Sequence, residues 1–288
     1  MNALRKTLIF ALAFCLCCSL AATTYARTFI DAHGNEIELD DSLEAYANFV
    51  LYGADNAARK GERNLGDLWA DALRWFAASG TMNEYFEEDD VAAGNTEIAV
   101  DADHIVALWN GGNLRADVAE GKFGAEQLAE VLPYPNKVAV VYMSGAQLLE
   151  VLEAASQALP CCEDTAAACA SFMQVSGLKY AVDTTKEYDK GEAYGDNWFK
   201  AASLNRVTIE EVNGKPFDAE ATYAVITSNA NFNGMDSSYM LKAAAEENEK
   251  STITTAVVRD VIWLYIAGEL NNVIGDPYAD AQGRITIK

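Results

Sequence analysis

Basic residues are scarce in this sequence, with 21 lysines and arginines against 43 aspartates and glutamates, so the formal net charge is −22. A surface of that sign repels nucleic-acid backbones and anionic bilayers. The charge balance therefore argues against general binding of DNA, RNA or a membrane surface. Hydrophobic residues make up 51% and charged residues 22% of the 288 residues. Those proportions are typical of a soluble globular chain and exclude a collagen, a coiled coil and a disordered chain.

Histidine is almost missing, because the chain has only His33 and His104. A two-metal phosphohydrolase needs several Asp, His and Asn ligands that converge on ions about 4 Å apart. Asp31-Ala32-His33 imitates the D-x-H start of such a site, and Gly94-Asn95-Thr96-Glu97 imitates G-N-H-E without its histidine. We interpret both as loop sequence. A G-x-S-x-G elbow and a P-loop are also absent, so the sequence does not support phosphate ester hydrolysis by this chain alone.

The apolar run at residues 7–20 is too short for a good membrane span. Arg5 and Lys6 precede it and small residues follow up to Ala26, which is the order of a secretory signal peptide. We predict that residues 1–26 are removed and that the protein is exported to the periplasm or the extracellular space. Lipid anchoring on a cysteine of this run is the less favoured alternative, since none follows the small residue that a lipoprotein signal requires.

Three cysteines remain after the predicted signal peptide: Cys161, Cys162 and Cys169. Thiols in an oxidising compartment tend to pair. One of the vicinal pair could bridge to Cys169 and close the loop between them, leaving one thiol over. The C-C-x6-C spacing matches no standard zinc site and neither histidine is near in sequence, so a loop staple or unpaired thiols are favoured over a metal.

The rest of the chain mixes helix and strand patterns. A hairpin is expected over Thr28–Leu39 and a helix over Ser42–Ala58, and a second helix opens at Asn64. Further strands are expected at Ile105–Trp109, Lys137–Met143, Phe172–Val182, Arg206–Val212, Thr222–Thr227 and Arg284–Lys288, and further helices at Gly124–Val131, Ala146–Leu159 and Thr254–Leu270. This mixture predicts an α/β (α+β) layered sandwich with mixed β-sheets flanked by helices.

Internal repeats and low-complexity linkers are absent, which favours one domain over residues 59–288 with a hairpin and helix extension at residues 27–58. The acidic segment Glu84–Asp103 has little periodicity, so we predict a solvated loop, with a calcium-binding cluster as the alternative.

The stretch that follows the first long strand pattern is the most informative. Asn110-Gly111-Gly112 comes directly after the apolar run, and Arg115 lies three residues further on. Glycines let backbone N–H groups approach an anion or a ring, and a guanidinium can hold a phosphate with two donors. Taken alone, the pattern fits a tight turn followed by a surface arginine better.

Five motifs, read in order, give this stretch a context. They are N-L-G-D-L with A-D-A-L-R (residues 64–74), N-G-G with L-R-A-D (110–117), V-L-P-Y (131–134), F-M-Q-V-S-G-L (172–178), and N-G-K-P (213–216) with T-Y (222–223). Over roughly Asn64 to Lys288 the chain closely resembles the C-terminal, substrate-recognition domain of the 5′-nucleotidase and UDP-sugar hydrolase family.

In that family an N-terminal metallophosphatase domain holds two metal ions, and the C-terminal domain holds the nucleoside between two aromatic rings and helps to bind the phosphates. The resemblance implies that Asn110, Gly111 and Gly112 line the nucleoside pocket. It also implies that Arg115 and Arg59 face phosphate, that Tyr134 stacks on the base, and that Asn136 makes a polar contact. The nine expected binding residues are Arg59, Asn110, Gly111, Gly112, Arg115, Tyr134, Asn136, Phe232 and Asp236.

The second aromatic position departs from the family pattern. The family usually has Asn-Phe and, a few residues later, Gly-Gly-Asp-Gly-Phe. Here an ungapped match on Asp236 places Ala230 at the stacking position and Phe232 two residues late. Met235 and Ser237 replace two of the glycines. Either Phe232 reaches the clamp through a remodelled loop, or the pocket holds a smaller or different ligand. For both Tyr134 and Phe232, ordinary core or surface packing is the alternative to stacking on a ligand.

We therefore predict an exported nucleotide- or nucleoside-recognition domain with no catalytic metal site of its own. Two alternatives remain. One is a subunit of a split two-chain 5′-nucleotidase, in which a separate metallophosphatase chain supplies the divalent metals. The other is a structural or interaction module whose pocket has decayed.

Overall fold

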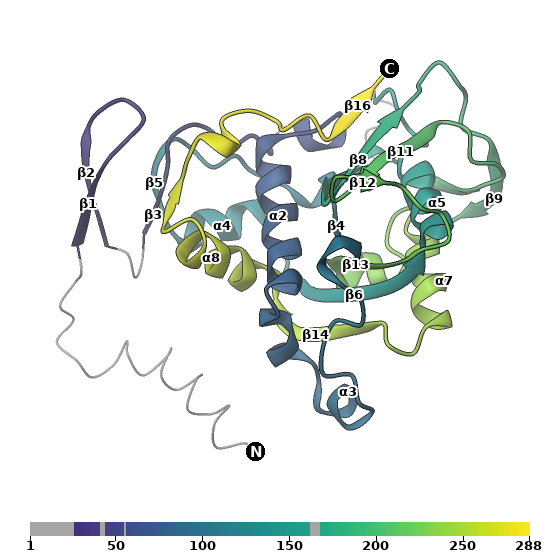
Figure 1. The fold of residues 1–288 in the computed structure, drawn as a ribbon. Helices are drawn as coiled ribbons and strands as arrows, with labels where there is room; N and C mark the ends of the chain where they lie inside the picture. The colour runs from purple at the N-terminus through teal and green to yellow at the C-terminus, as the bar shows by residue number, and fades with distance from the viewer. Residues whose placement is uncertain (1–25, 41–43, 55, 162–167) are drawn as a thin grey trace.

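The computed structural model describes residues 26–40, 44–54, 56–161 and 168–288 (Figure 1). Cys162 and all but the last residue of the predicted signal peptide lie outside these residues. Within the described ranges, no helix combines the length and the apolar character needed to cross a bilayer.

Strands account for much of the chain. They are β1 (Ala26–Ile30), β2 (Glu36–Asp40), β3 (Ala45–Ala47), β4 (Ile105–Asn110), β5 (Gly121–Phe123), β6 (Lys137–Ser144), β7 (Met173–Ser176), β8 (Leu178–Val182), β9 (Lys190–Tyr194), β10 (Trp198–Ala201), β11 (Val207–Val212), β12 (Lys215–Pro216), β13 (Thr222–Ser228), β14 (Thr252–Val257), β15 (Val273–Ile274) and β16 (Ile285–Ile287).

The helices lie mainly between these strands. They are α2 (Asn64–Ala78), α3 (Glu88–Ala92), α4 (Ala125–Val131), α5 (Gly145–Ala155), α6 (Asn229–Phe232), α7 (Tyr239–Glu247) and α8 (Val258–Gly268). Three short 3-10 helices matter for the site: η1 (Ala57–Arg59), η4 (Gly111–Asn113) and η6 (Ala168–Ser171).

A five-stranded sheet in the order β14-β6-β13-β4-β7 forms the centre of the fold. β13 and β4 are parallel, whereas β6 and β7 run antiparallel to them. Every residue of β4 is buried, and its side chains alternate between two apolar layers, with Ala107 and Trp109 in one and Val106 and Leu108 in the other. The continuous apolar run therefore marks a strand that is covered on both faces.

One face of the central sheet packs against α2 and α8, and the other packs against α5 and α7 (Figure 1). The second apolar layer also includes residues of the four-stranded sheet in the order β12-β11-β8-β16. Mixed sheets covered by helices form a layered α/β sandwich, so the fold predicted from the sequence is confirmed.

The hairpin predicted over Thr28–Leu39 is confirmed as β1 paired with β2, but the helix predicted over Ser42–Ala58 is wrong. In the described part of that segment β3 pairs with β5 and β15, and Leu51 bridges to Val118. All three residues of β3 are buried between its partner strands. Pairing with segments far away in sequence therefore overrides the local helical pattern.

Three further element predictions need correction. The single strand expected over Phe172–Val182 is divided at Gly177 into β7 and β8, which belong to different sheets. Gly177 has φ +79°, a backbone conformation that favours glycine. The helix expected from Thr254 begins only at Val258, because the β-branched residues before it form β14 against β6. The acidic segment Glu84–Asp103, expected to be a loop, contains the short helix α3.

Acidic side chains near the start of α2 hold the C-terminal segment in place. The carboxylate of Glu62 accepts the backbone N–H groups of Arg284 and Ile285, each at 2.9 Å. Arg284 donates to Asp71 at 2.7 Å, and its Nε lies 3.8 Å from the Asp67 carboxylate. Asp67 is fully buried, and its Oδ1 has no hydrogen-bond partner among the residues that the structure describes.

A junction of three chain segments forms at the end of β4, where Gly111 and Gly112 lie in η4. A Cβ on Gly111 would overlap the carbonyl oxygen of Ala58 in η1, and a Cβ on Gly112 would lie 2.7 Å from the Cβ of Ala170 in η6. The Gly111 N–H donates to the Phe172 carbonyl at 2.7 Å. We call this contact of η1, η4 and η6 the glycine junction. It places the backbone of η1 and η6 directly against η4.

The buried position of Asp67 predicts a pH-dependent stability. Burial raises the pKa of its carboxyl from 3.8 to about 8; the charge of Arg284 opposes this shift and the neighbouring Glu62 adds to it. The folded protein therefore keeps a proton that the unfolded chain has already released, so the stability from Asp67 is complete below about pH 4 and is lost as the pH rises toward 8.

Urea denaturation between pH 5 and pH 8 measures this loss. We expect the free energy of unfolding of the wild type to fall by more than about 1.4 kcal/mol, the equivalent of one pKa unit, with a smaller fall in Asp67→Asn. The variant retains every other acidic residue, so it controls for general charge repulsion. Equal slopes in the two proteins would mean that Asp67 is ionised throughout.

The glycine junction predicts a steric penalty at Gly111. Gly111→Ala is expected to lower the free energy of unfolding by about 1–3 kcal/mol, because η1 must move away from the new methyl group. Gly268→Ala is the matched control, since nothing lies within 4 Å of a Cβ there, and should change stability by less than about 1 kcal/mol. Similar losses in both variants, measured by urea denaturation, would show that the contact at Gly111 can relax.

Candidate functional site

The site residues predicted from the sequence lie on loops at one edge of the central sheet. The parallel strands β4 and β13 end there at Asn110 and Ser228, and the antiparallel strands β6 and β7 begin there. The loops after β4 and β13 therefore meet the loops before β6 and β7. The ends of parallel strands in open sheets commonly hold ligands.

A carboxylate and two guanidinium groups form the charged part of this edge. Burial raises the pKa of Asp236, whereas the nearby Arg59, a hydrogen bond from Asn110 and the charge of Arg115 act in the opposite direction. The Asn110 Nδ2 donates to Asp236 at 3.1 Å, and the Asn110 Oδ1 accepts from Asn113 at 2.8 Å. We call Arg59, Arg115, Asp236 and Asn110 the charged cluster.

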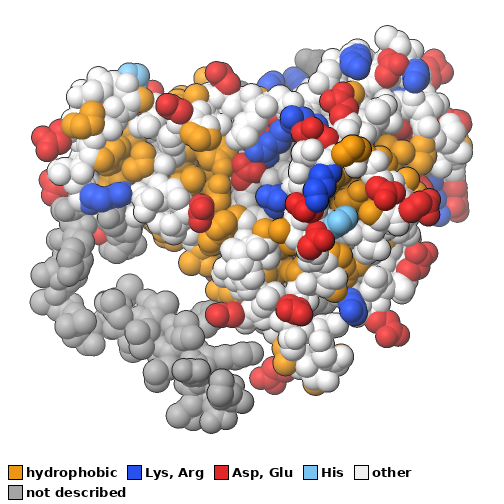
Figure 2. Space-filling view, in the orientation of Figure 1, with side chains coloured by type: hydrophobic (Ala, Val, Ile, Leu, Met, Phe, Trp, Pro, Cys, Tyr) orange, Lys and Arg blue, Asp and Glu red, His pale blue; other side chains and the backbone are white. Residues whose placement is uncertain are grey.

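The charged cluster has two cations and one carboxylate. Burial is the main cause that lowers the pKa of Arg59, and the charge of Arg115 adds to it, while Asp236 opposes it. The side chain of Arg115 is exposed. On the face of the molecule that Figure 2 shows, acidic side chains are interspersed with lysines and arginines. The cluster is therefore a local excess of positive charge on an acidic protein, suited to an anion.

A buried glutamine from β7 holds the loop that carries Arg59. The Nε2 of Gln174 donates to the carbonyl oxygens of Ala58 and Gly61, at 2.8 and 2.9 Å. Its Oε1 accepts the backbone N–H of Arg63 at 3.0 Å. The loop is thus fixed on both sides of Arg59, and this fixation limits the rearrangement needed to bind a ligand.

Gly111 and Gly112, expected to line a pocket, are buried in the glycine junction. Their missing side chains leave space that η1 and η6 fill. The structure therefore gives the two glycines a packing role beneath the charged cluster.

Tyr134 and Phe232 differ in exposure. Tyr134 is 54% exposed, whereas Phe232 is half-buried and packs against the second apolar layer. The backbone N–H of Asn136 donates to the Tyr134 carbonyl at 2.9 Å, and the Asn136 carbonyl accepts the N–H of Val258 at 2.8 Å. Lys137, next in the chain, donates its N–H to the Asn229 side chain at 3.0 Å, so the Tyr134 loop lies beside α6.

The hairpin of β9 and β10 supports the loop after β13, and the sequence did not point to it. The Tyr194 hydroxyl donates to the Gly234 carbonyl at 2.7 Å, and its ring lies 5.6 Å from that of Tyr239. Gly234 has φ +86°. The turn residue Gly195 between Tyr194 and Trp198 could have indicated a hairpin, but not its contact with residues some forty positions later.

The two imitations of metal-site sequence do not converge. Asp31 accepts the backbone N–H groups of His33 and Asn35 within its own turn, and His33 pairs with Glu120 at 2.9 Å. Gly94 to Glu97 line a separate small pocket beside Lys250. In the described part of the chain no three His, Cys, Asp or Glu side chains gather as a metal ion would need, so these residues do not fit a metal pair.

Comparison with known proteins gives this arrangement a family. The chain is 27% identical over 207 residues to the trifunctional nucleotide phosphoesterase protein YfkN of Bacillus subtilis, a match that covers 71% of this chain and 12% of the relative. It is 30% identical over 183 residues to the cell wall protein Lmo0130 of Listeria monocytogenes, covering 64% of this chain and 19% of the relative.

A solved structure described as a 5′-nucleotidase precursor from Thermus thermophilus matches with a TM-score of 0.59 and 26% identity, over 85% of this chain and 39% of that one. The chain therefore spans well under half the length of these relatives. The family model described as 5′-nucleotidase, C-terminal domain, matches residues 44–243. By this match the chain belongs to the family of 5′-nucleotidase C-terminal domains.

Proposed function

We propose that this domain binds a nucleotide or nucleoside at the edge of the central sheet. The observation that carries the proposal is the charged cluster, in which Arg59 and Arg115 lie close enough to influence the same carboxylate, Asp236. Two guanidinium groups match the geometry of a phosphate better than any other common side chain. The similarity to proteins named as a nucleotide phosphoesterase and a 5′-nucleotidase supports the same ligand class.

Each part of a nucleotide has a partner of suitable chemistry in this proposal. Arg115 and Arg59 hold the phosphate, and Asp236, held in place by the hydrogen bond from Asn110, offers an acceptor to the sugar hydroxyls. The exposed ring of Tyr134 stacks on the base, and Asn136 contacts its polar edge. Phe232 would need to leave its apolar packing to form a second ring of a clamp, so we assign base stacking to Tyr134.

We also propose that the protein is exported and that its role is recognition, with any hydrolysis performed by a metallophosphatase domain that holds the divalent metals. The similarity to a cell wall protein supports export. So does the disulfide between Cys161 and Cys169, because such bonds persist in oxidising compartments. The greater length of the relatives supports the need for a further domain.

Arg115 is expected to contribute to the binding of phosphorylated ligands but not to the binding of unphosphorylated ones. Arg115→Ala should weaken AMP binding by about 1.5–3 kcal/mol, because a hydrogen bond to a charged group is lost, while adenosine binding changes little. Titration calorimetry measures both constants, and no phosphate should be released in the same samples. Lys186→Ala, which removes an exposed charge next to Asp183, is the control. Equal losses for AMP and adenosine would contradict the phosphate role of Arg115.

Tyr134 is expected to act on the base whatever the phosphate state. Tyr134→Ala should cost about 1–3 kcal/mol of binding free energy for AMP and adenosine alike. The side chain is 54% exposed, so the fold should remain as stable as that of the wild type. Ile30→Ala, in the β1–β2 hairpin, removes another exposed apolar side chain as the control. An unchanged dissociation constant would remove Tyr134 from the site.

A further inference from the structure

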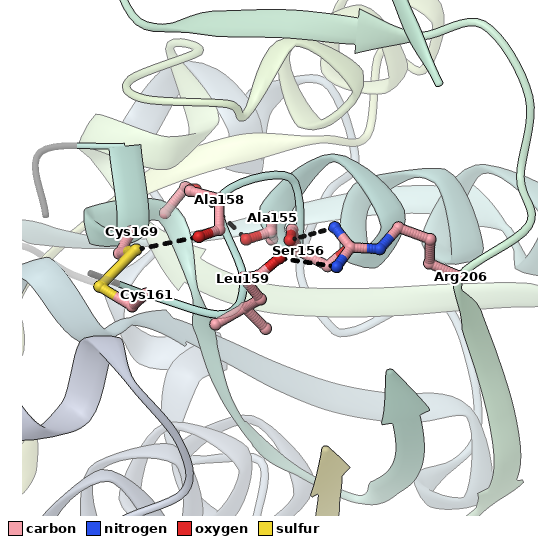
Figure 3. The surroundings of a disulfide bond; sticks show 8 residues. Ala155, Ser156, Ala158, Leu159, Cys161, Cys169 and Arg206 are labelled. Atoms are coloured by element: carbon pink, nitrogen blue, oxygen red, sulfur yellow. Dashed lines mark hydrogen bonds between the residues drawn. A yellow bond between two sulfur atoms is a disulfide. The ribbon is translucent and has the colours of Figure 1, made fainter. Parts of the chain in front are cut away.

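The disulfide between Cys161 and Cys169 joins the segment after α5 to the short helix η6 (Figure 3). Its two Cα atoms are 6.0 Å apart. Cys169 is 1% exposed. This pairing is one of those left open by the sequence, and it connects two parts of the chain with very different neighbours.

The Cys161 side of the bond is firmly anchored. The guanidinium of the buried Arg206 donates to the carbonyl oxygens of Ser156 and Leu159, both at 2.8 Å, as Figure 3 shows. The buried carboxylate of Glu153 in α5 accepts the backbone N–H groups of Arg206 and Val207 at 2.9–3.1 Å. The end of α5 and the residues after it are therefore fixed to the start of β11.

The Cys169 side of the bond supports the proposed ligand site. The Ala170 carbonyl, one residue after Cys169, accepts the Nδ2 of Asn110 at 3.4 Å. The same nitrogen donates to Asp236. Ala170 also lies against Gly112, and the Phe172 carbonyl accepts the N–H of Gly111. Any displacement of η6 therefore moves a partner of Asn110 and one side of the glycine junction.

η6 also contacts the segment around the end of α5 in two places within the described residues, one of which is a hydrogen bond. The Ser171 hydroxyl donates to the Ala155 carbonyl at 3.3 Å. The Sγ of Cys169 lies 3.5 Å from the Ala158 carbonyl. This contact is not a hydrogen bond while the disulfide is intact, because a disulfide sulfur has no hydrogen to donate. A free thiol there could donate only a weak hydrogen bond.

We propose that the Cys161–Cys169 disulfide is a positioning device for the ligand site: it holds η6 against η4 and so fixes the amide of Asn110 toward Asp236. The effect on ligands rests on the proposed nucleotide site. Reducing the bond weakens ligand binding although neither cysteine contacts the ligand and no ligand-contacting side chain is chemically changed. The pair thereby makes affinity dependent on the redox state of the surroundings, because a dithiol can cleave the bond.

The reaction is a thiol–disulfide exchange. Dithiothreitol supplies two electrons and two protons, the S–S bond breaks, Cys161 and Cys169 become thiols, and the reagent becomes a cyclic disulfide. Four samples test the consequence: oxidised wild type, wild type reduced with dithiothreitol, the double variant Cys161→Ser with Cys169→Ser, and Cys162→Ala. The last is the control for the neighbouring cysteine and retains both bonded sulfurs.

Two measurements are made on each sample: the AMP dissociation constant by calorimetry and amide hydrogen exchange of peptides that cover residues 110–113 and 168–172. We expect reduction to raise the dissociation constant about two- to tenfold, the range for one hydrogen bond, and to speed exchange in both peptides. The double variant should have the dissociation constant and the exchange rates of the reduced wild type, and dithiothreitol should change neither. Cys162→Ala should behave like oxidised wild type.

The two proposals fail in different ways. Faster exchange on reduction in a protein that never binds AMP would uphold the positioning role and overturn the nucleotide site. Unchanged exchange at residues 110–113 in a reduced protein that stays folded by near-ultraviolet circular dichroism would overturn the positioning role. If reduction unfolds the whole protein, Ser171→Ala loosens η6 with the disulfide intact; faster exchange at residues 110–113 then supports the proposal, and unchanged exchange overturns it.

Discussion

The contact of three backbone segments at the end of β4 determines how the rest of the site is built. η1 and η6 can approach η4 only because Gly111 and Gly112 lack side chains. That approach brings Arg59, which follows Ala58 in η1, to the same place as the loop that carries Arg115. It also lets the Ala170 carbonyl reach the amide of Asn110. Residues from widely separated parts of the chain become neighbours through one steric condition.

Electrostatics then gives this edge its chemical character. The whole chain has a formal net charge of −22, yet in the charged cluster two guanidinium groups lie near enough to a single carboxylate to affect it. Charges farther away than about 8 Å are largely screened at physiological ionic strength. A ligand bound at this edge, as proposed, would therefore respond to Arg59, Arg115 and Asp236 more than to the acidic surface. A net charge of this sign argues against long polyanions as partners, but not against one small phosphate.

Local patterns in the sequence were sufficient for part of the structure. The apolar run of β4, the glycines after it and the helix that opens at Asn64 all follow from residues close together in the chain, and the structure contains each of them. The helix expected over Ser42–Ala58 failed because β3 pairs with strands that lie about 75 and 230 residues further on. No local pattern contains that information.

The motif around Gln174 shows why the candidate site could be predicted only in part. The residue types of this motif helped to identify the family. They do not reveal that the buried side-chain amide of Gln174 binds the loop of Arg59 through the backbone of Ala58, Gly61 and Arg63. Two positions later Ser176 donates to Asp71, which also receives Arg284 from the C-terminal segment. The short strand β7 thus connects the candidate site to the C-terminal segment. Motifs far apart in sequence occur together because each supplies the hydrogen-bond partners that another would otherwise leave buried and unpaired.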